Sequence, residues 1–340
     1  MEILWFWLVA IMIAGYVVLD GFDLGAGILH LCVARSDAER RIVLRSIGPV
    51  WDGNEVWLLA GGGTLYFAFP SLYASSFSGF YLPLMMVLWL LILRAISIEF
   101  RNHIDSPAWT PIWDAVFFLA SALLAIFFGA ALGNVVRGVP LNPRGEFFLP
   151  LWTDFQIGPE PGILDWYTVL VGLFAFATLT LHGARWLVLK TEGGIRTRAE
   201  AVAGQAWRAV LALTILTTLV TFRIQPHIPA NFTRYPAGYL FPLLALAGLA
   251  DMRLFARRGL EMQAFLSSCL YIVGMLTSAV FGVFPYVLPS VSDPQFGLTV
   301  YNASTAPYGL AVGLAWWIPG MLLVGVYHFV VYRHFAGKVR

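Results

Sequence analysis

Long apolar stretches alternate with short polar connections along the whole chain, and nine of these stretches could cross a bilayer as helices. A transmembrane helix needs about 20 mainly apolar residues. The short alternating segments that are typical of a membrane β-barrel do not occur. The pattern therefore predicts an all-α, polytopic membrane bundle that forms one integral domain over residues 1–340. The predicted spans are residues 3–31, 50–69, 78–98, 113–135, 164–189, 206–224, 238–255, 264–284 and 307–333.

Basic residues in the connections predict how this bundle is oriented, because cytoplasmic connections of membrane proteins are enriched in Lys and Arg. One set of alternate connections, together with the C-terminal end, holds fourteen basic residues, whereas the opposite set holds four. We therefore expect the N-terminus outside and the C-terminus in the cytoplasm. The fourteen are Arg35, Arg40, Arg41, Arg45, Arg101, Lys190, Arg196, Arg198, Arg253, Arg257, Arg258, Arg333, Lys338 and Arg340, and the four are Arg137, Arg144, Arg223 and Arg234.

Composition supports the membrane interpretation and narrows the chemistry. Hydrophobic residues make up 59% of the chain and charged residues 12%, whereas a soluble domain carries about 25% charged residues. The net charge of +2 gives no reason to expect nucleic acid as a partner. The two cysteines, Cys32 and Cys269, form no Cys-x-x-Cys motif, which argues against attached haem, iron–sulfur clusters and thiolate zinc sites. We expect neither a metal site nor catalytic residues in this chain.

Carboxylates inside or beside the predicted spans are the main functional candidates, because such groups are expensive in a membrane and usually mark an ion or proton route. Asp20 and Asp23 lie in the inner half of the first span, and Asp52 and Glu55 lie at the inner end of the second. Asp114 begins the fourth span on the same side. We expect these five acids to form a cytoplasmic proton pathway. For Asp52 and Asp114, the alternative is an N-terminal acid that complements the helix dipole.

Arg94 lies near the inner end of the third span and needs a carboxylate partner, or must extend to the interface. We predict a structural ion pair that includes Arg94, preferably with one of the aspartates. Glu99, about one turn further along, is the other acid assigned to this pair. Trp51 and Trp57 flank the inner end of the second span. They belong either to the interfacial aromatic belt or to a contact with a quinone or lipid.

Small residues and histidines give weaker signals. Gly21 and Gly25 are spaced to let another helix approach the first span closely. The glycines at 61–63 are predicted to allow a tight helix contact or the approach of a bulky group. His182 is the clearest histidine at membrane depth. No His or Met pairs with it convincingly as a second haem ligand, so we predict a hydrogen-bonded histidine within the bundle.

Several segments resemble signatures of subunit II of cytochrome bd quinol oxidase, in order and along nearly the whole chain. The first two read Asp-Gly-Phe-Asp-Leu-Gly-Ala-Gly at 20–27 and Gly-Pro-Val-Trp-Asp-Gly-Asn-Glu-Val-Trp at 48–57. The connection at about 224–238 is short, as in the compact and often cyanide-insensitive branch of the family. The remaining segments are 77–81, 133–140, 284–290 and 302–305.

The resemblance implies a subunit of a terminal quinol oxidase in the bacterial cytoplasmic (inner) membrane. Its implied partner, subunit I, carries two b-type haems and one d-type haem, oxidises quinol and reduces O2 to water without pumping protons. Subunit II itself is implied to hold no haem, although some members bind a structural quinone. Small single-helix subunits and membrane lipids are further implied partners. Family members place the aspartate that corresponds to Asp52 in a proton path into subunit I, whereas some carry Gln in place of Glu55.

Two other classes of protein stay open at this point. A proton-coupled secondary transporter could use the same acids, but it would be expected to show internal repeats and broken helices in both halves. Only the glycines at 61–63 suggest such a break. A haem-bearing membrane anchor would need paired axial ligands, which the sequence does not offer. Co-isolation with a haem-rich membrane partner would favour the oxidase subunit over both.

Overall fold

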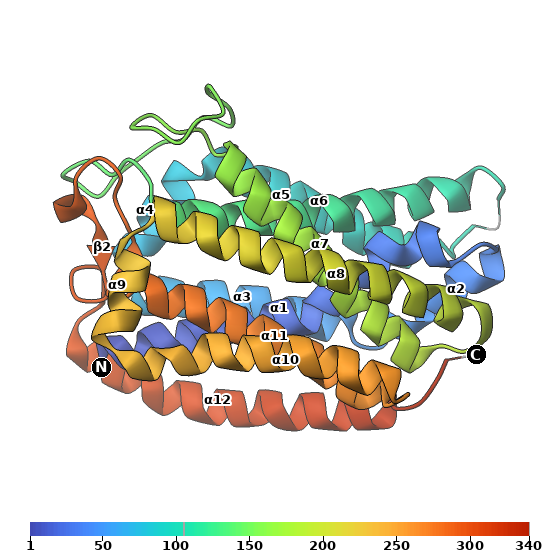
Figure 1. The fold of residues 1–340 in the computed structure, drawn as a ribbon. Coiled ribbons are helices and arrows are strands. Elements are labelled where there is room, and N and C mark those ends of the chain that lie inside the picture. The colour runs from blue at the N-terminus through green and yellow to red at the C-terminus, as the bar shows by residue number, and fades with distance from the viewer. Residues whose placement is uncertain (105, 340) are drawn as a thin grey trace.

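The computed structural model describes residues 1–104 and 106–339, and most of this chain is helical. Long helices run side by side along one direction, and the two termini lie at opposite ends of the bundle (Figure 1). The long helices are α1 (Glu2–Val33), α3 (Trp51–Ala68), α5 (Tyr81–Phe100), α6 (Trp109–Arg137), α7 (Trp166–Lys190), α8 (Gly193–Ile224), α10 (Leu240–Arg257), α11 (Glu261–Val283) and α12 (Pro307–His334).

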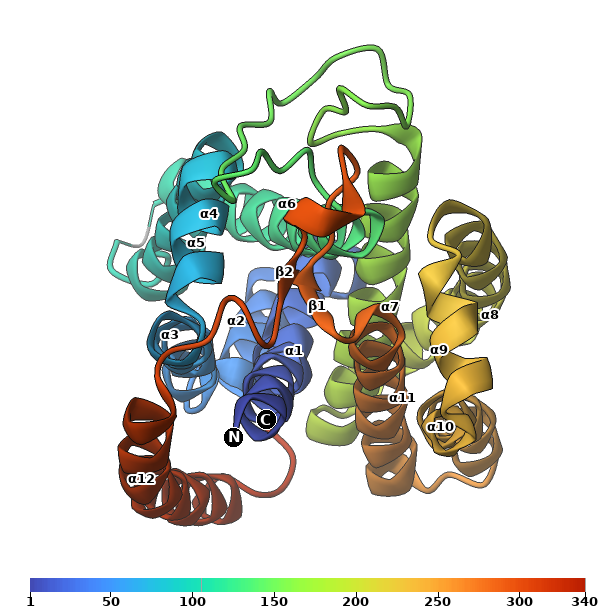
Figure 2. The same cartoon turned by 90° about the vertical axis from the view of Figure 1, so that its left-hand side faces the viewer.

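Eight helices within the described residues are long and apolar enough to cross a membrane. They correspond to eight of the nine predicted spans, with α10 extended by the 3-10 turn at Pro236–Tyr239. The ninth predicted span forms α3, which has 18 residues. Helix α3 is not among the eight, because Asp52, Asn54 and Glu55 in its first turns make it less apolar than the others. Even so, α3 lies against α1, at one side of the bundle (Figure 2).

Three short helices occupy segments that the sequence predicted as connections: α2 (Asp37–Ile47), α4 (Pro70–Gly79) and α9 (His227–Arg234). Ser36 begins α2 by accepting a hydrogen bond from the Glu39 backbone N–H at 3.3 Å. One face of α2 is buried through Val43 and Ile47. The prediction missed α2 because 11 residues with many charges do not resemble a span. The end of the bundle where α2 lies is called the α2 end below.

The opposite end is closed by irregular chain and a small sheet. Strands β1 (Tyr286–Leu288) and β2 (Leu298–Thr299) pair antiparallel. A second apolar core at this end includes Trp5, Phe69 and Leu141. This end of the bundle therefore has an apolar core of its own, separate from the main core around α1, α7 and α11.

Two glycines let α1 and α7 cross with their backbones in contact. A side chain at Gly25 would collide with the Leu179 carbonyl and with Gly183, and a side chain at Gly183 would collide with Gly25. The predicted close approach at Gly25 is confirmed. By contrast, apart from the neighbouring backbone of α3 itself, no described atom lies within 4 Å of a Cβ built at Gly62 or Gly63. The close contact predicted for those glycines is therefore not made within this chain.

We expect Gly183→Leu to destabilise the protein by about 3 kcal/mol, at the upper end of the range for overpacked cores. The reason is that the obstacle is backbone of α1, which cannot move aside as a side chain could. The thermal unfolding midpoint in detergent measures the effect. Gly204→Leu is the matched control, because it lies in α8 with no described atom within 4 Å of its Cβ. Equal midpoints for the two variants would contradict the expectation.

Helix α12 is the least buried of the long helices, and Leu310 is its one buried residue in the described chain. Figure 2 shows it apart from α10 and α11, on the side of α1 and α3. Two polar contacts join it to α3. Trp57 Nε1 donates to His328 Nε2 at 3.1 Å, and Tyr332 Oη donates to Asn54 Oδ1 at 2.8 Å.

Candidate functional site

A buried ion pair joins α5 to α1 inside the bundle. Arg94 Nη1 donates to Asp20 Oδ2 at 2.7 Å, and Arg94 Nη2 donates to Asp20 Oδ1, so the contact is bidentate. Both side chains are 0% exposed. Charge-assisted forks of this kind are among the strongest hydrogen bonds in proteins and fix both groups in orientation. Arg94 therefore pairs with an aspartate of α1 and does not extend to the interface.

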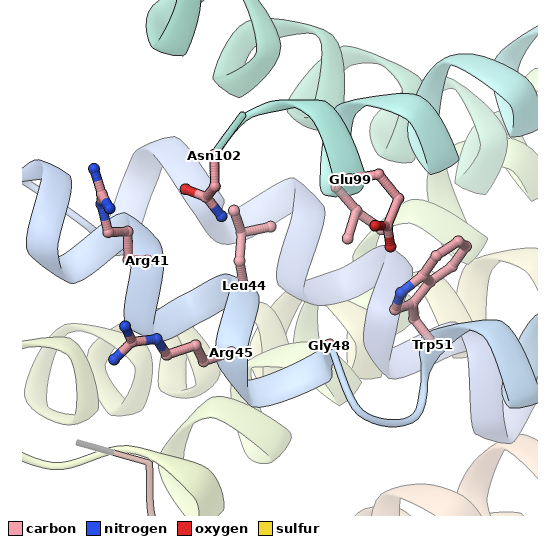
Figure 3. Close-up of a pocket in the computed structure, with 8 residues that line it drawn as sticks. Arg41, Leu44, Arg45, Gly48, Trp51, Glu99 and Asn102 are labelled. Carbon is pink, nitrogen blue, oxygen red and sulfur yellow. The ribbon is translucent and has the colours of Figure 1, made fainter. Parts of the chain in front are cut away.

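The second acid near Arg94 is Glu55 of α3, whose Oε2 lies 3.9 Å from Arg94 Nη2. Glu99, which the sequence assigned to this pair, is not among the described partners of Arg94. Five residues separate the two positions on α5, so their side chains point about 140° apart around the helix axis. Glu99 is exposed instead and lines a cavity with Trp51 (Figure 3). The second acid near Arg94 is therefore Glu55 and not Glu99.

Asn54 extends these contacts to a third carboxyl group and to the last helix. Its Nδ2 donates to Asp23 Oδ2 at 2.7 Å and to the Leu19 carbonyl at 3.2 Å. Its Oδ1 accepts from Tyr332. Sequence reasoning missed Tyr332, because an aromatic residue near the end of an apolar helix is read as part of the interfacial belt. One amide therefore ties α1, α3 and α12 together.

We call Asp20, Asp23, Asn54, Glu55 and Arg94 the polar cluster. Three carboxyl groups face one guanidinium there, so full ionisation would leave negative charge uncompensated. Asp23 Oδ1 and Glu55 Oε2 are buried without a hydrogen-bond partner among the described residues. Uncompensated charge is costly in an apolar medium, and uptake of a proton removes it. The arrangement can therefore support proton exchange inside the helix bundle.

Asp52 lies outside the polar cluster. It is exposed in the first turn of α3 and shares one stripe of that helix with Val56, Leu59 and Tyr66. These positions recur at intervals of three or four residues, which places them on a single helix face. The glycine at 63 is on the same stripe and is also exposed. The face of α3 that carries Asp52 is thus left uncovered by this chain.

The two tryptophans of α3 lie in different surroundings. Trp57 fills the space between α1 and α12. Its ring packs against Gly15, where a Cβ would lie 2.7 Å from the nearest ring atom. Its indole N–H donates a hydrogen bond to His328. Trp51 is half-buried and lines the cavity of Figure 3. Trp51 is therefore the better placed of the two for contact with a ligand from outside the chain.

Asp114 lies at the α2 end in a second charged group. It accepts from Arg101 Nε at 2.5 Å and from Arg40 Nη1 at 3.0 Å, and its Oδ1 is 2.5 Å from His30 Nε2. Arg101 also donates to Asp37 of α2 at 2.7 Å, and this bond lowers the pKa of the Asp37 carboxyl. The group joins α1, α2, α5 and α6, and its charges are well matched.

This environment suits a structural clamp better than the proton route predicted for Asp114, because strong donors already occupy both of its oxygens. Sequence reasoning counted Arg40 and Arg101 only as signs of orientation. It did not single out His30. An acid at the start of a span, opposite two arginines on the same side, is the signal that could have suggested the clamp.

His182 is hydrogen-bonded within the bundle, as predicted. Its Nδ1 lies 2.7 Å from Ser268 Oγ, and its Nε2 lies 2.8 Å from the Val18 carbonyl. A haem iron could bind His182 only if one of these bonds broke. In the described part of the chain, no group of three or more His, Cys, Asp or Glu side chains is placed to hold a metal ion.

Known proteins share both the sequence and the fold. The curated relatives include a probable cytochrome oxidase subunit 2 of Haemophilus influenzae, 31% identical over 100% of this chain and 95% of the relative. The cytochrome bd-I ubiquinol oxidase subunit 2 of Escherichia coli is 29% identical over 95% of this chain and 90% of its own. The cytochrome bd ubiquinol oxidase subunit 2 of Bacillus subtilis is 31% identical over 91% and 88%.

A solved structure of the bd oxidase from Geobacillus thermodenitrificans superposes with a TM-score of 0.79. The two chains share 17% identity and cover 98% of each other, which shows a common fold. The family profile described as cytochrome bd terminal oxidase subunit II matches residues 1–335. A match over nearly all of the chain, relatives that align over 88–95% of their own length and a shared helical fold agree: this protein belongs to the family of cytochrome bd terminal oxidase subunit II.

Proposed function

We propose that this chain is the haem-free subunit II of a quinol oxidase and contributes a proton-uptake path from the cytoplasm. Its partner would be subunit I, which carries two b-type haems and one d-type haem, oxidises quinol and reduces O2 to water. The observation that carries the proton path is the polar cluster, where Asp20 and Glu55 lie against one guanidinium and Asp23 adds a third, buried carboxyl group. The transporter alternative is not favoured, because the family profile matches residues 1–335.

The proposed topology has nine spans with the N-terminus outside and the C-terminus in the cytoplasm of a bacterial inner membrane. Two observations support it. The termini lie at opposite ends of the bundle (Figure 1), as an odd number of spans requires. The α2 end, where the connections are rich in arginine, also holds the C-terminal end of α12 (Figure 1). In this topology α3 is the ninth span, kept in the membrane by its neighbours.

Subunit I is proposed to cover the exposed stripe of α3. Val56 is 49%, Leu59 74% and Tyr66 61% exposed, and the neighbouring helix α5 exposes Trp89 by 61%. Lipid alone would suit the apolar members, but it would not suit Asp52 on the same stripe. A protein partner can offer Asp52 a polar neighbour. It can also fill the open space beside the glycines at 62 and 63.

The proposed path begins at Asp52, which is exposed at the α2 end, and continues across the subunit boundary. Reduction of O2 to water takes up protons, and drawing them from the cytoplasm contributes to the membrane potential. One elementary charge moved through 100 mV is worth about 2.3 kcal/mol. Asp20, Asp23 and Glu55 are the other acids assigned to this path, and they would exchange protons with Asp52. Asp114 is left out of this path, because the clamp already engages it.

A structural quinone and small single-helix subunits remain proposals from the family resemblance. Trp57 is already packed against α1 and α12, so a quinone on α3 would meet Trp51 first. The histidines at membrane depth are engaged in hydrogen bonds, which supports placing the haems on the partner.

Purification of this chain through an affinity tag tests the proposed function. We expect a larger membrane partner to co-purify, together with the absorption band of a d-type haem in the reduced-minus-oxidised spectrum. The band should leave with the partner when the complex is dissociated, because the haems are proposed to reside there. Haem retained by this chain alone would contradict the proposal. A haem-free chain that purifies without any partner would contradict it as well and would favour a transporter.

A further inference from the structure

A cavity opens at the α2 end, between α2, the end of α5 and the start of α3 (Figure 3). Its volume is about 340 Å³, and it is open to the surroundings. The apolar floor consists of Leu44 and Ile98. Neither the polar cluster nor the Asp114 clamp contributes a side chain to it. The proposed proton path therefore does not account for this cavity.

One side of the cavity is basic. Arg41 and Arg45 lie one turn apart on α2, with Asn102 close by (Figure 3). Arg41 donates through Nε to Asp37 at 2.8 Å, and among the described residues its terminal nitrogens have no partner. No ion pair of Arg45 is found in the described chain, and Arg45 is exposed. Two arginine forks with an amide beside them are a suitable set of donors for a phosphate group.

The other side of the cavity is acidic and aromatic. The Glu99 carboxylate lies beside the Trp51 indole, across Gly48 from the two arginines (Figure 3). Glu99 forms no ion pair within residues 1–104 and 106–339, because Arg94 turns inward to Asp20. A carboxylate next to the face of an indole is suited to an ammonium group, through charge and through the cation–π interaction. The cavity therefore presents opposite charges at its two sides.

The position of the cavity fits a lipid headgroup. It lies where α3 and α5 reach the end of the bundle, at the depth where tryptophans are enriched at membrane interfaces. Ile92 lies seven residues before Glu99 on α5, on the same face of the helix, and is an exposed apolar residue along which an acyl chain could lie.

We propose that this cavity binds an amine-bearing phospholipid of the phosphatidylethanolamine class. The phosphate contacts Arg41, Arg45 and Asn102, and the ammonium contacts Glu99 and Trp51. A lipid with a phosphate but no ammonium, such as phosphatidylglycerol, would leave the Glu99 carboxylate beside the bound anion. The cavity therefore selects the zwitterionic headgroup. This proposal does not depend on the proton path.

The test uses the complex purified through this chain, reconstituted in nanodiscs with equal amounts of phosphatidylethanolamine and phosphatidylglycerol. Native mass spectrometry then counts the lipids that stay bound. We expect phosphatidylethanolamine to be retained preferentially. Glu99→Gln should reduce that preference about fivefold, as for one exposed ion pair. Arg45→Gln should instead lower the retention of both lipids, because both carry the phosphate. Glu160→Gln and Arg258→Gln are matched controls at exposed sites outside the cavity and should leave the preference unchanged.

Equal retention of both lipids by the unmodified complex would overturn the proposal, and so would an undiminished preference in Glu99→Gln. A competition experiment separates headgroup recognition from simple phosphate binding. Soluble glycerophosphoethanolamine should displace the lipid at concentrations where inorganic phosphate does not. If inorganic phosphate competes equally well, the cavity recognises phosphate alone and the ammonium contact is refuted.

Discussion

Arg94→Ala is expected to prevent stable assembly, with a loss of about 3–5 kcal/mol in the free energy of unfolding. The variant leaves the Asp20 carboxylate buried at 0% exposure without the guanidinium that neutralises it. It also removes the nearest cation from Glu55. The yield of monodisperse complex in size-exclusion chromatography and its thermal midpoint measure the loss.

Two further variants separate the charge from the geometry of this pair. Arg94→Lys keeps a positive charge but cannot form the bidentate contact, so its stability should fall between that of Arg94→Ala and the unmodified protein. The double variant Asp20→Leu/Arg94→Met replaces the pair with apolar groups and should recover much of the lost stability. If Arg94→Ala assembled as well as the unmodified chain, the buried pair would not be a structural requirement.

Asp52→Asn is expected to lower quinol-driven O2 uptake by at least about tenfold, as for removal of a proton-transferring side chain. The amide keeps the shape of the side chain but cannot carry a proton. Because Asp52 has no described partner within this chain to lose, and because the amide can still hydrogen-bond to subunit I, the haem spectrum and the stability of the complex should stay unchanged. Oxygen electrode measurements with a reduced quinol analogue give the rate.

The matched control for this prediction is Asp251→Asn, which makes the same substitution on α10 without a described contact to the polar cluster. Its uptake rate should equal that of the unmodified complex. An Asp52→Asn complex with full activity would remove Asp52 from the proton path. An Asp52→Asn complex that loses its haem would instead indicate a role of Asp52 in assembly.

The sequence was sufficient for the long helices, but not for the pairing of the acids. Membrane depth alone required a partner for Arg94, and topology placed the aspartates on its side. The choice between Asp20, Glu55 and Glu99 depended on helix rotation, which apolar surroundings on all sides do not reveal. The clamp around Asp114 was missed for another reason. Arg40 belongs to α2, an amphipathic helix too short and too charged to be recognised as a membrane element.

The contact between Tyr332 and Asn54 has a consequence for how this protein is made. The two residues are 278 positions apart, and the amide that Tyr332 orients also donates to Asp23. A ribosome therefore releases α1 and α3 into the membrane long before α12 exists, and until then Asn54 lacks its hydroxyl donor. The polar cluster is completed only at the end of synthesis. Chains interrupted before α12 would keep an unfinished polar site in the lipid, which membrane proteases can recognise as a sign of incomplete translation.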